Sequence, residues 1–140
     1  MTRLFIVDTN VLVAALITRH GDSPTARVLN AMIDGRLLFL LSPALLAEYR
    51  SVLLRPRLLA THRLTEAEID ELLATITANA LWREPAAPAP QPAPDAGDAH
   101  LWALMASEPA AELITGDQLL LQRPYPGRVI TSPRDHFGSA

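Results

Sequence analysis

The stretch Leu4-Phe5-Ile6-Val7-Asp8-Thr9-Asn10 decides the fold, because it is a run of apolar residues that ends in a carboxylate. Consecutive apolar residues of β-branched and aromatic type predict a strand that is buried on both faces. Helical patterns follow this strand, so we expect an α/β protein with a central parallel sheet. Asp8 then lies at the carboxyl end of the first strand, where open α/β sheets place their ligand crevice.

Two interpretations of Asp8 remain open at this point. A buried carboxylate is costly unless a positive charge pairs with it, and a hard cation prefers oxygen ligands. Alternatively, Asp8 only caps the helix that follows, together with Thr9 and Asn10. The stretch by itself does not decide between a metal ligand and a cap.

Length and composition exclude several classes of protein. A chain of 140 residues without cysteine predicts a single domain over residues 1–140, and it excludes disulfides and thiolate metal sites. All 12 basic residues are arginine, so a P-loop, a Schiff base and a receiver-type switch lack the lysine they need. The net charge of −3 means that any binding of nucleic acid must be local.

The start of the chain and its hydropathy bear on location. The first residues predict a strand and not a basic and then apolar leader. No apolar run approaches the roughly 20 residues that span a bilayer. We therefore expect a cytoplasmic protein without a membrane segment.

Further strands and helices can be placed along the chain. A continuous apolar run predicts a strand near residues 37–41, and shorter, partly apolar segments predict strands near residues 81–82, 111–114 and 128–131. Cap-and-proline pairs at Ser23-Pro24 and Ser42-Pro43, and a capping box at Thr65, predict the starts of three helices. Residues 85–94 alternate proline with alanine and predict an exposed, extended connection.

Three more carboxylates take positions comparable to that of Asp8. Glu48 lies early in the helix after Ser42-Pro43, Asp98 precedes an apolar helix, and Asp117 follows the strand near residues 111–114 through a glycine. If the strands are parallel, all four acids face one crevice. Each has a simpler explanation, as a surface glutamate or as a helix cap. One shared site explains the positions of all four acids, whereas the simpler explanations must hold for each acid separately. The pattern therefore favours a shared site.

A cluster of carboxylates is self-repelling, and bound divalent cations remove the repulsion. Oxygen ligands without cysteine or a histidine pair favour Mg²⁺ or Mn²⁺ over zinc. Two such ions about 4 Å apart are the usual apparatus for phosphodiester cleavage.

With these residues the chain resembles PIN-domain proteins, and it is most similar to the toxin components of type II toxin–antitoxin pairs. The resemblance covers nearly the whole chain. Its motifs are Val7-Asp8-Thr9-Asn10-Val11, Ser42-Pro43 through Glu48, Asp95 to Leu101, Thr115-Gly116-Asp117 and Ser132-Pro133-Arg134.

The resemblance implies a three-layer α/β/α sandwich with a central, mostly parallel five-stranded sheet. It also implies a Mg²⁺- or Mn²⁺-dependent endoribonuclease that acts on RNA, with an antitoxin as partner. The implied metal-binding catalytic acids are Asp8, Glu48, Asp98 and Asp117, supported by Asn10 and Thr115. We further expect a homodimer.

The acidic segment before the last long helix departs from the dense cluster that such proteins often show. This leaves open whether Asp95 or Asp98 is the ligand. We assign Asp98, because it directly precedes the helix, whose free amides can hold its carboxylate. Asp95 lies at the end of the proline-rich connection and is kept as an accessory ligand.

Two other functions are open from sequence. A phosphatase with an aspartyl nucleophile also begins with an acid after the first strand, although it usually has a second acid where this chain has Asn10. A non-catalytic module that binds nucleic acid or protein is the other alternative. For contacts with RNA phosphates the candidates are Arg50, Arg55 and Arg57, which are otherwise ordinary surface charges.

Overall fold

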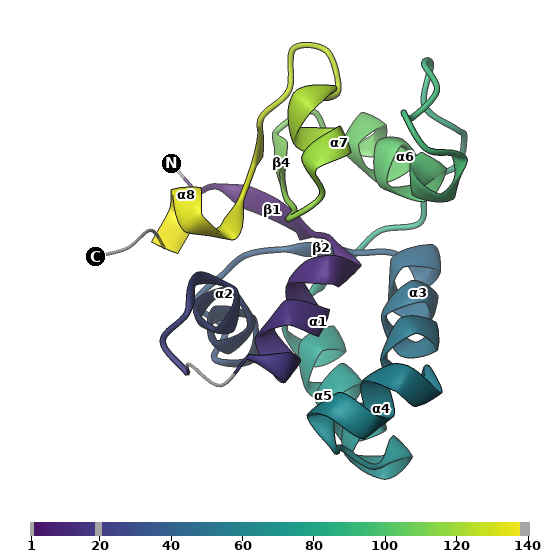
Figure 1. The fold of residues 1–140 in the computed structure, drawn as a ribbon. Helices are drawn as coiled ribbons and strands as arrows, with labels where there is room; N and C mark the ends of the chain where they lie inside the picture. The colour runs from purple at the N-terminus through teal and green to yellow at the C-terminus, as the bar shows by residue number, and fades with distance from the viewer. Residues whose placement is uncertain (1, 19–20, 138–140) are drawn as a thin grey trace.

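The computed structural model describes residues 2–18 and 21–137. These residues form parallel strands with helices on both sides (Figure 1). In Figure 1, α6 (Ala99–Ser107) and α7 (Gln118–Gln122) lie above the strands. Below them lie α1 (Thr9–Ile17), α2 (Pro24–Ile33), α3 (Pro43–Leu53), α4 (Pro56–His62) and α5 (Glu66–Asn79). A short helix, α8 (Pro133–Phe137), packs against α2. None of the helices described is long and apolar enough to cross a membrane.

The strands pair in parallel in two sheets. In the first, β1 (Leu4–Val7) pairs with β4 (Ala111–Ile114), and β4 pairs with β5 (Ile130–Thr131). In the second, β2 (Leu40–Leu41) pairs with β3 (Leu81–Trp82). A single parallel bridge between Phe5 and Phe39 links the two sheets. The parallel α/β architecture agrees with the prediction, whereas a continuous five-stranded sheet is not confirmed, because the ladders divide the strands into three and two.

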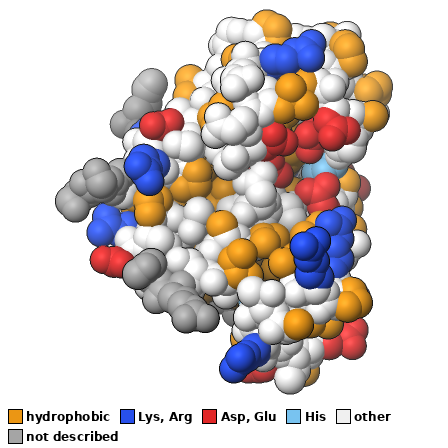
Figure 2. Space-filling view, in the orientation of Figure 1, with side chains coloured by type: hydrophobic (Ala, Val, Ile, Leu, Met, Phe, Trp, Pro, Cys, Tyr) orange, Lys and Arg blue, Asp and Glu red, His pale blue; other side chains and the backbone are white. Residues whose placement is uncertain are grey.

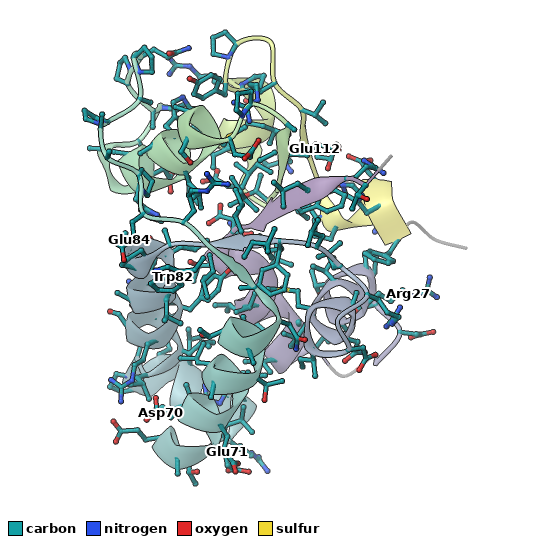
Figure 3. The ribbon with its side chains drawn as sticks, turned by 180° about the vertical axis from the view of Figure 1, so that it is seen from behind. Arg27, Asp70, Glu71, Trp82, Glu84 and Glu112 are labelled. Carbon is teal, nitrogen blue, oxygen red and sulfur yellow. The ribbon has the colours of Figure 1, made fainter. Side chains whose placement is uncertain are left out.

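The core lies where the predicted buried strands meet the helices. Ile6 and Val7 of β1 and Leu113 and Ile114 of β4 have no exposed surface. In contrast, Leu81 and Trp82 of β3 are 44% and 47% exposed. The prediction of strands at both places is therefore confirmed, but β3 lies at an edge with its side chains at the surface (Figure 3).

The helix caps predicted from the sequence are present at the starts of α2, α3 and α5. Ser23 Oγ accepts a hydrogen bond from Ala26 N at 3.2 Å, and Ser42 Oγ accepts one from Leu45 N at 3.1 Å. Thr65 forms the expected reciprocal capping box with Glu68. Residues 85–94 contain neither helix nor strand, as predicted. They are not fully exposed, however, because alanines of this segment, Ala89 and Ala93, pack against the core.

Tyr49 on α3 ties that helix to the end of β1. Its side chain is fully buried, and its hydroxyl donates a hydrogen bond to the carbonyl of Val7 at 2.5 Å. Burial, followed by the negative charges of Asp8 and Glu48, raises the pKa of this hydroxyl well above its usual value. The hydroxyl therefore keeps the proton that it donates.

We expect Tyr49→Phe to lower the free energy of unfolding by about 1–2 kcal/mol, because the buried carbonyl of Val7 loses this partner. The Tm should fall by roughly 3–8 °C in thermal melts. Tyr125→Phe is the matched control, since the Tyr125 hydroxyl has no protein hydrogen bond among the described residues. Equal Tm values for Tyr49→Phe and the wild type would contradict the prediction.

Candidate active site

A cavity of about 410 Å³ lies at the carboxyl ends of β1 and β4. The four acids singled out in the sequence, Asp8, Glu48, Asp98 and Asp117, all line it, although they come from four separate segments. Figure 2 shows acidic side chains gathered in the notch between the upper and lower helices, with a histidine beside them. The rest of the lining consists of Thr9, Asn10, Val13, Val52, Arg55 and Leu58.

Asp8 is the most buried of these acids, with 4% of its surface exposed. Its Oδ1 accepts a hydrogen bond from Thr9 N at 2.8 Å, so it does cap α1. Its Oδ2 accepts from Thr115 Oγ1 at 2.8 Å and from Asn10 Nδ2 at 3.1 Å. Asn10 and Thr115 thus support Asp8 from two different segments. Capping uses Oδ1 of Asp8, and the side chain nevertheless lines the pocket.

Thr115 and Asn10 also position the segment that carries Asp117. Thr115 is fully buried, and its Oγ1 accepts a hydrogen bond from Asp117 N at 3.0 Å. Asn10 Oδ1 accepts one from Gly116 N at 2.8 Å. A Cβ at position 116 would lie 3.3 Å from Asn10 Oδ1, so the glycine permits this close approach. Asp117 Oδ1 in turn caps α7 through Leu119 N at 2.9 Å.

Both carboxylate oxygens of Glu48 are occupied. Thr9 Oγ1 donates a hydrogen bond to Oε1, and His100 Nε2 lies 2.9 Å from Oε2. Because a carboxylate only accepts, the ring nitrogen is the donor. The other ring nitrogen of His100, Nδ1, is buried and has no hydrogen-bond partner among the described residues. Glu48 is therefore held between α1 and α6 by two donors, Thr9 and His100.

Asp98 and Asp95 have different surroundings in the structure, but the helix amides that were expected to hold Asp98 are not the cause. Asp98 lines the cavity and stands at the start of α6, yet its side chain makes no capping hydrogen bond there. Asp95 does not line the cavity, and its Oδ1 accepts a hydrogen bond from Gly97 N at 3.0 Å. The expectation that amides of the helix hold Asp98 is thus wrong. Asp98 thus lines the pocket with a carboxylate that caps no helix, while Asp95 caps the 3₁₀ turn Ala96–Asp98.

The electrostatics of the pocket disfavour a full set of negative charges. Burial, followed by the charges of Asp8, Asp95, Asp117 and Glu48, raises the pKa of Asp98 to about 6. Burial is also the largest cause that raises the pKa of Asp8, which its hydrogen bonds with Thr115 and Thr9 partly oppose. The acids therefore repel one another across the pocket, and a bound cation would relieve the repulsion.

The three candidate arginines have different surroundings. Arg55 lines the acidic cavity, and Figure 2 shows basic side chains below the acids, over α3 and α4. Arg57 is exposed and does not line the cavity. Arg50 pairs with Asp70 at 2.8 Å and with Glu66 at 2.9 Å, on α5. Asp70 is labelled in Figure 3 among the lower helices, so the structure does not bring Arg50 to the pocket.

The donor set fits a hard divalent cation in its chemistry, since every candidate ligand is a carboxylate oxygen. The distances between these carboxylates fit a bound ion less well. Across residues 2–18 and 21–137, no three Asp, Glu or His side chains are close enough together to enclose an ion in this conformation. Metal binding by these acids would therefore require movement of side chains toward a common point, including Glu48, which Thr9 and His100 hold here.

Comparison with known families agrees with this geometry. The model of the PIN domain matches residues 5–119. The chain belongs to the PIN-domain family. PIN domains are generally nucleases, which are hydrolases, and they typically use divalent metal ions. No curated protein matches the chain in sequence.

His100 is the residue of this PIN-domain site that the sequence analysis did not single out. It lies two residues after Asp98, within the first turn of α6, and it contacts Glu48 without itself lining the acidic cavity. That spacing is a weak signal, because a lone histidine on an apolar helix is more often part of the core. Its contact with Glu48, 52 positions away in the chain, becomes visible only in the fold.

We expect Asp98→Asn to stabilise the metal-free protein at neutral pH. A pKa raised by folding means that the native state binds the proton more tightly, so the stability that protonated Asp98 contributes is fully present below about pH 4 and is lost as the pH rises through about 6. In thermal melts with chelator, the variant should gain a few degrees in Tm over the wild type between pH 4 and pH 7.5. Asp95→Asn, at an exposed position, should show a smaller gain. A difference between Asp98→Asn and the wild type that does not change with pH would contradict the prediction.

Proposed function

We propose that this protein is a metal-dependent endoribonuclease that hydrolyses RNA phosphodiesters. The observation that carries the proposal is the meeting of four carboxylates from separate segments in one pocket at the strand ends of a PIN domain. The raised pKa of Asp98 supports it, because its causes, burial first and then the charges of the neighbouring acids, are typical of a functional pocket. The choice of RNA as substrate, and of Mg²⁺ or Mn²⁺ as the ion, rests on the resemblance of the motifs.

In this proposal Asp8, Asp98 and Asp117 hold the metal, and Glu48 completes the set. A divalent ion supplies Lewis-acid chemistry there, activating water and neutralising charge on the phosphate. The protein's own contribution is positioning. Asn10 and Thr115 hold Asp8, while Thr9 and His100 hold Glu48. Catalysis depends on such fixed geometry, since small displacements of ligands are costly.

Arg55 is the residue best placed to bind a phosphate of the substrate. It lines the same cavity as the four acids and forms no ion pair within the described part of the chain. An unpaired arginine at the rim offers its guanidinium to a phosphate in bidentate geometry. We therefore narrow the candidate RNA-binding arginines to Arg55, with Arg57 as a neighbour on the same helical segment.

The aspartyl-phosphatase alternative is less well supported. A nucleophilic Asp8 needs an accessible oxygen, but this side chain is 4% exposed, and both of its oxygens accept hydrogen bonds. Such an environment suits a held ligand better than an attacking group. The remaining alternative is a non-catalytic module. It predicts that the wild type has no nuclease activity that charge-removing variants could lower.

We expect Asp98→Asn to lower single-turnover cleavage of RNA by at least about 100-fold in saturating Mn²⁺, since a ligand is lost from the pocket. Asp95→Asn removes the same charge three residues away and should keep most of the rate, because Asp95 does not line the cavity. Chelator should abolish the wild-type activity. Equal losses for both variants would make the two acids joint ligands, and unimpaired cleavage by Asp98→Asn would refute its assignment.

The similarity of the motifs to toxin components extends the proposal to a toxin that an antitoxin partner neutralises. Induced expression of the wild type should then arrest bacterial growth, and Asp8→Asn should not, although it retains the fold. Growth curves with matched protein levels on immunoblots measure this. Growth unaffected by an active wild-type nuclease would refute the toxin role. The homodimer stays a prediction from sequence.

A further inference from the structure

A second groove, of about 520 Å³, adjoins the acidic cavity. The two share Asn10 and Asp117 and lie on either side of α1. In Figure 2, hydrophobic side chains border the acidic group toward α1, α2 and α8. The further lining residues of this second groove are Val11, Ala14, Thr25, Gly116 and Pro133.

The lining of the second groove is almost free of charge. Asp117 is the one charged residue among the described residues that line it, and it stands at the border with the acidic cavity. Val11, Ala14 and Pro133 present apolar surface, and Thr25 adds a hydroxyl. A phosphate finds no cation here and is repelled by Asp117. An uncharged, largely apolar group with a few polar edge atoms fits this lining.

RNA alternates these two kinds of group along its strand, because each charged phosphate is followed by a neutral base. A phosphodiester at the acidic cavity therefore places a neighbouring nucleoside within reach of the second groove, which begins at the same two residues, Asn10 and Asp117. Arg55 lines the acidic cavity but not the second groove. The distribution of charge in the two pockets thus suits an RNA strand whose phosphate lies toward Arg55 and whose neighbouring base lies toward Ala14.

We propose that the second groove is a nucleoside subsite, which binds the unpaired base next to the scissile phosphate of single-stranded RNA. The inference rests on the proposed nuclease function and adds to it the form of the substrate. A base that enters the groove leaves its stack and its pairing partner, so a duplex cannot occupy both sites at once. The groove then selects unpaired RNA at the cleavage position.

The test uses oligoribonucleotides with a known cleavage site, in which one base at a time is replaced by an abasic nucleotide. In the wild type, removal of the base at one position next to the cut should lower kcat/KM by at least roughly tenfold, since an apolar group no longer fills its pocket. Substitution of a base several nucleotides away should have little effect. Single-turnover rates in saturating Mn²⁺ give the values.

Two variants then fill the groove from opposite walls. Ala14→Phe extends from α1, and Thr25→Phe extends from α2. Each should slow the intact substrate to about the rate of the abasic one, and the penalty for the missing base should disappear. Ile17→Phe adds a ring to an exposed position of α1 that does not line the groove, and it should retain the wild-type penalty. Thermal melts establish that each variant is folded.

The outcomes distinguish this subsite from the nuclease proposal. If the wild type cleaves RNA and no abasic position matters, the subsite is refuted and the nuclease function stands. If both filled variants keep the full penalty, the base binds elsewhere, and the subsite is likewise refuted. A wild type that cleaves no RNA overturns both proposals. Loss of the penalty in the filled variants would not be a sign of general damage to the site, because general damage slows intact and abasic substrates equally.

Discussion

The parallel pairing of β1 with β4 is the constraint on which the site depends. Val7 lies opposite Ile114, and Asp8 N donates a hydrogen bond to the carbonyl of Ile114 at 2.9 Å. Both segments therefore leave the sheet at the same edge and in the same direction. Residues 8–10 and 115–117 become neighbours there, although they are over 100 positions apart. A shift of register by one residue would turn every side chain of the strand to the other face.

The acids of the pocket are held by groups other than arginines. One hydroxyl, one amide and backbone N–H groups donate to Asp8 and Asp117, and a hydroxyl and an imidazole donate to Glu48. Among the described residues, neither Asp8, Asp98 nor Asp117 forms an ion pair with an arginine. Neutral donors orient a carboxylate without cancelling its charge. The charge therefore remains available to a cation, at a cost in stability that functional sites commonly carry.

Helix α1 has a role beyond carrying the residues that follow Asp8. It is short, it begins at the strand end, and it separates the acidic cavity from the neighbouring groove. Thr9 and Val13 line only the former, Val11 and Ala14 line only the latter, and Asn10 lines both. One short helix therefore faces the acidic cavity on one side and the largely apolar groove on the other, because successive residues are about 100° apart around a helix. Its sequence alone showed only an apolar helix.

Local chemistry in the sequence determined the strands β1 and β4, the serine and threonine caps, and the four acids of the pocket. These features depend on neighbours within a few residues, and apolar runs, prolines and capping side chains report such neighbours directly. Only the tertiary structure decided that the ladders split into three strands and two, that Asp98 is free while Asp95 caps, that Arg50 pairs with α5, and that His100 holds Glu48. The ladder split, the pairing of Arg50 and the contact of His100 depend on segments distant in the chain, for which the order of residues carries no local signal. The cap by Asp95 is a local contact with Gly97, but it depends on a backbone turn that the residue types did not distinguish from a cap by Asp98.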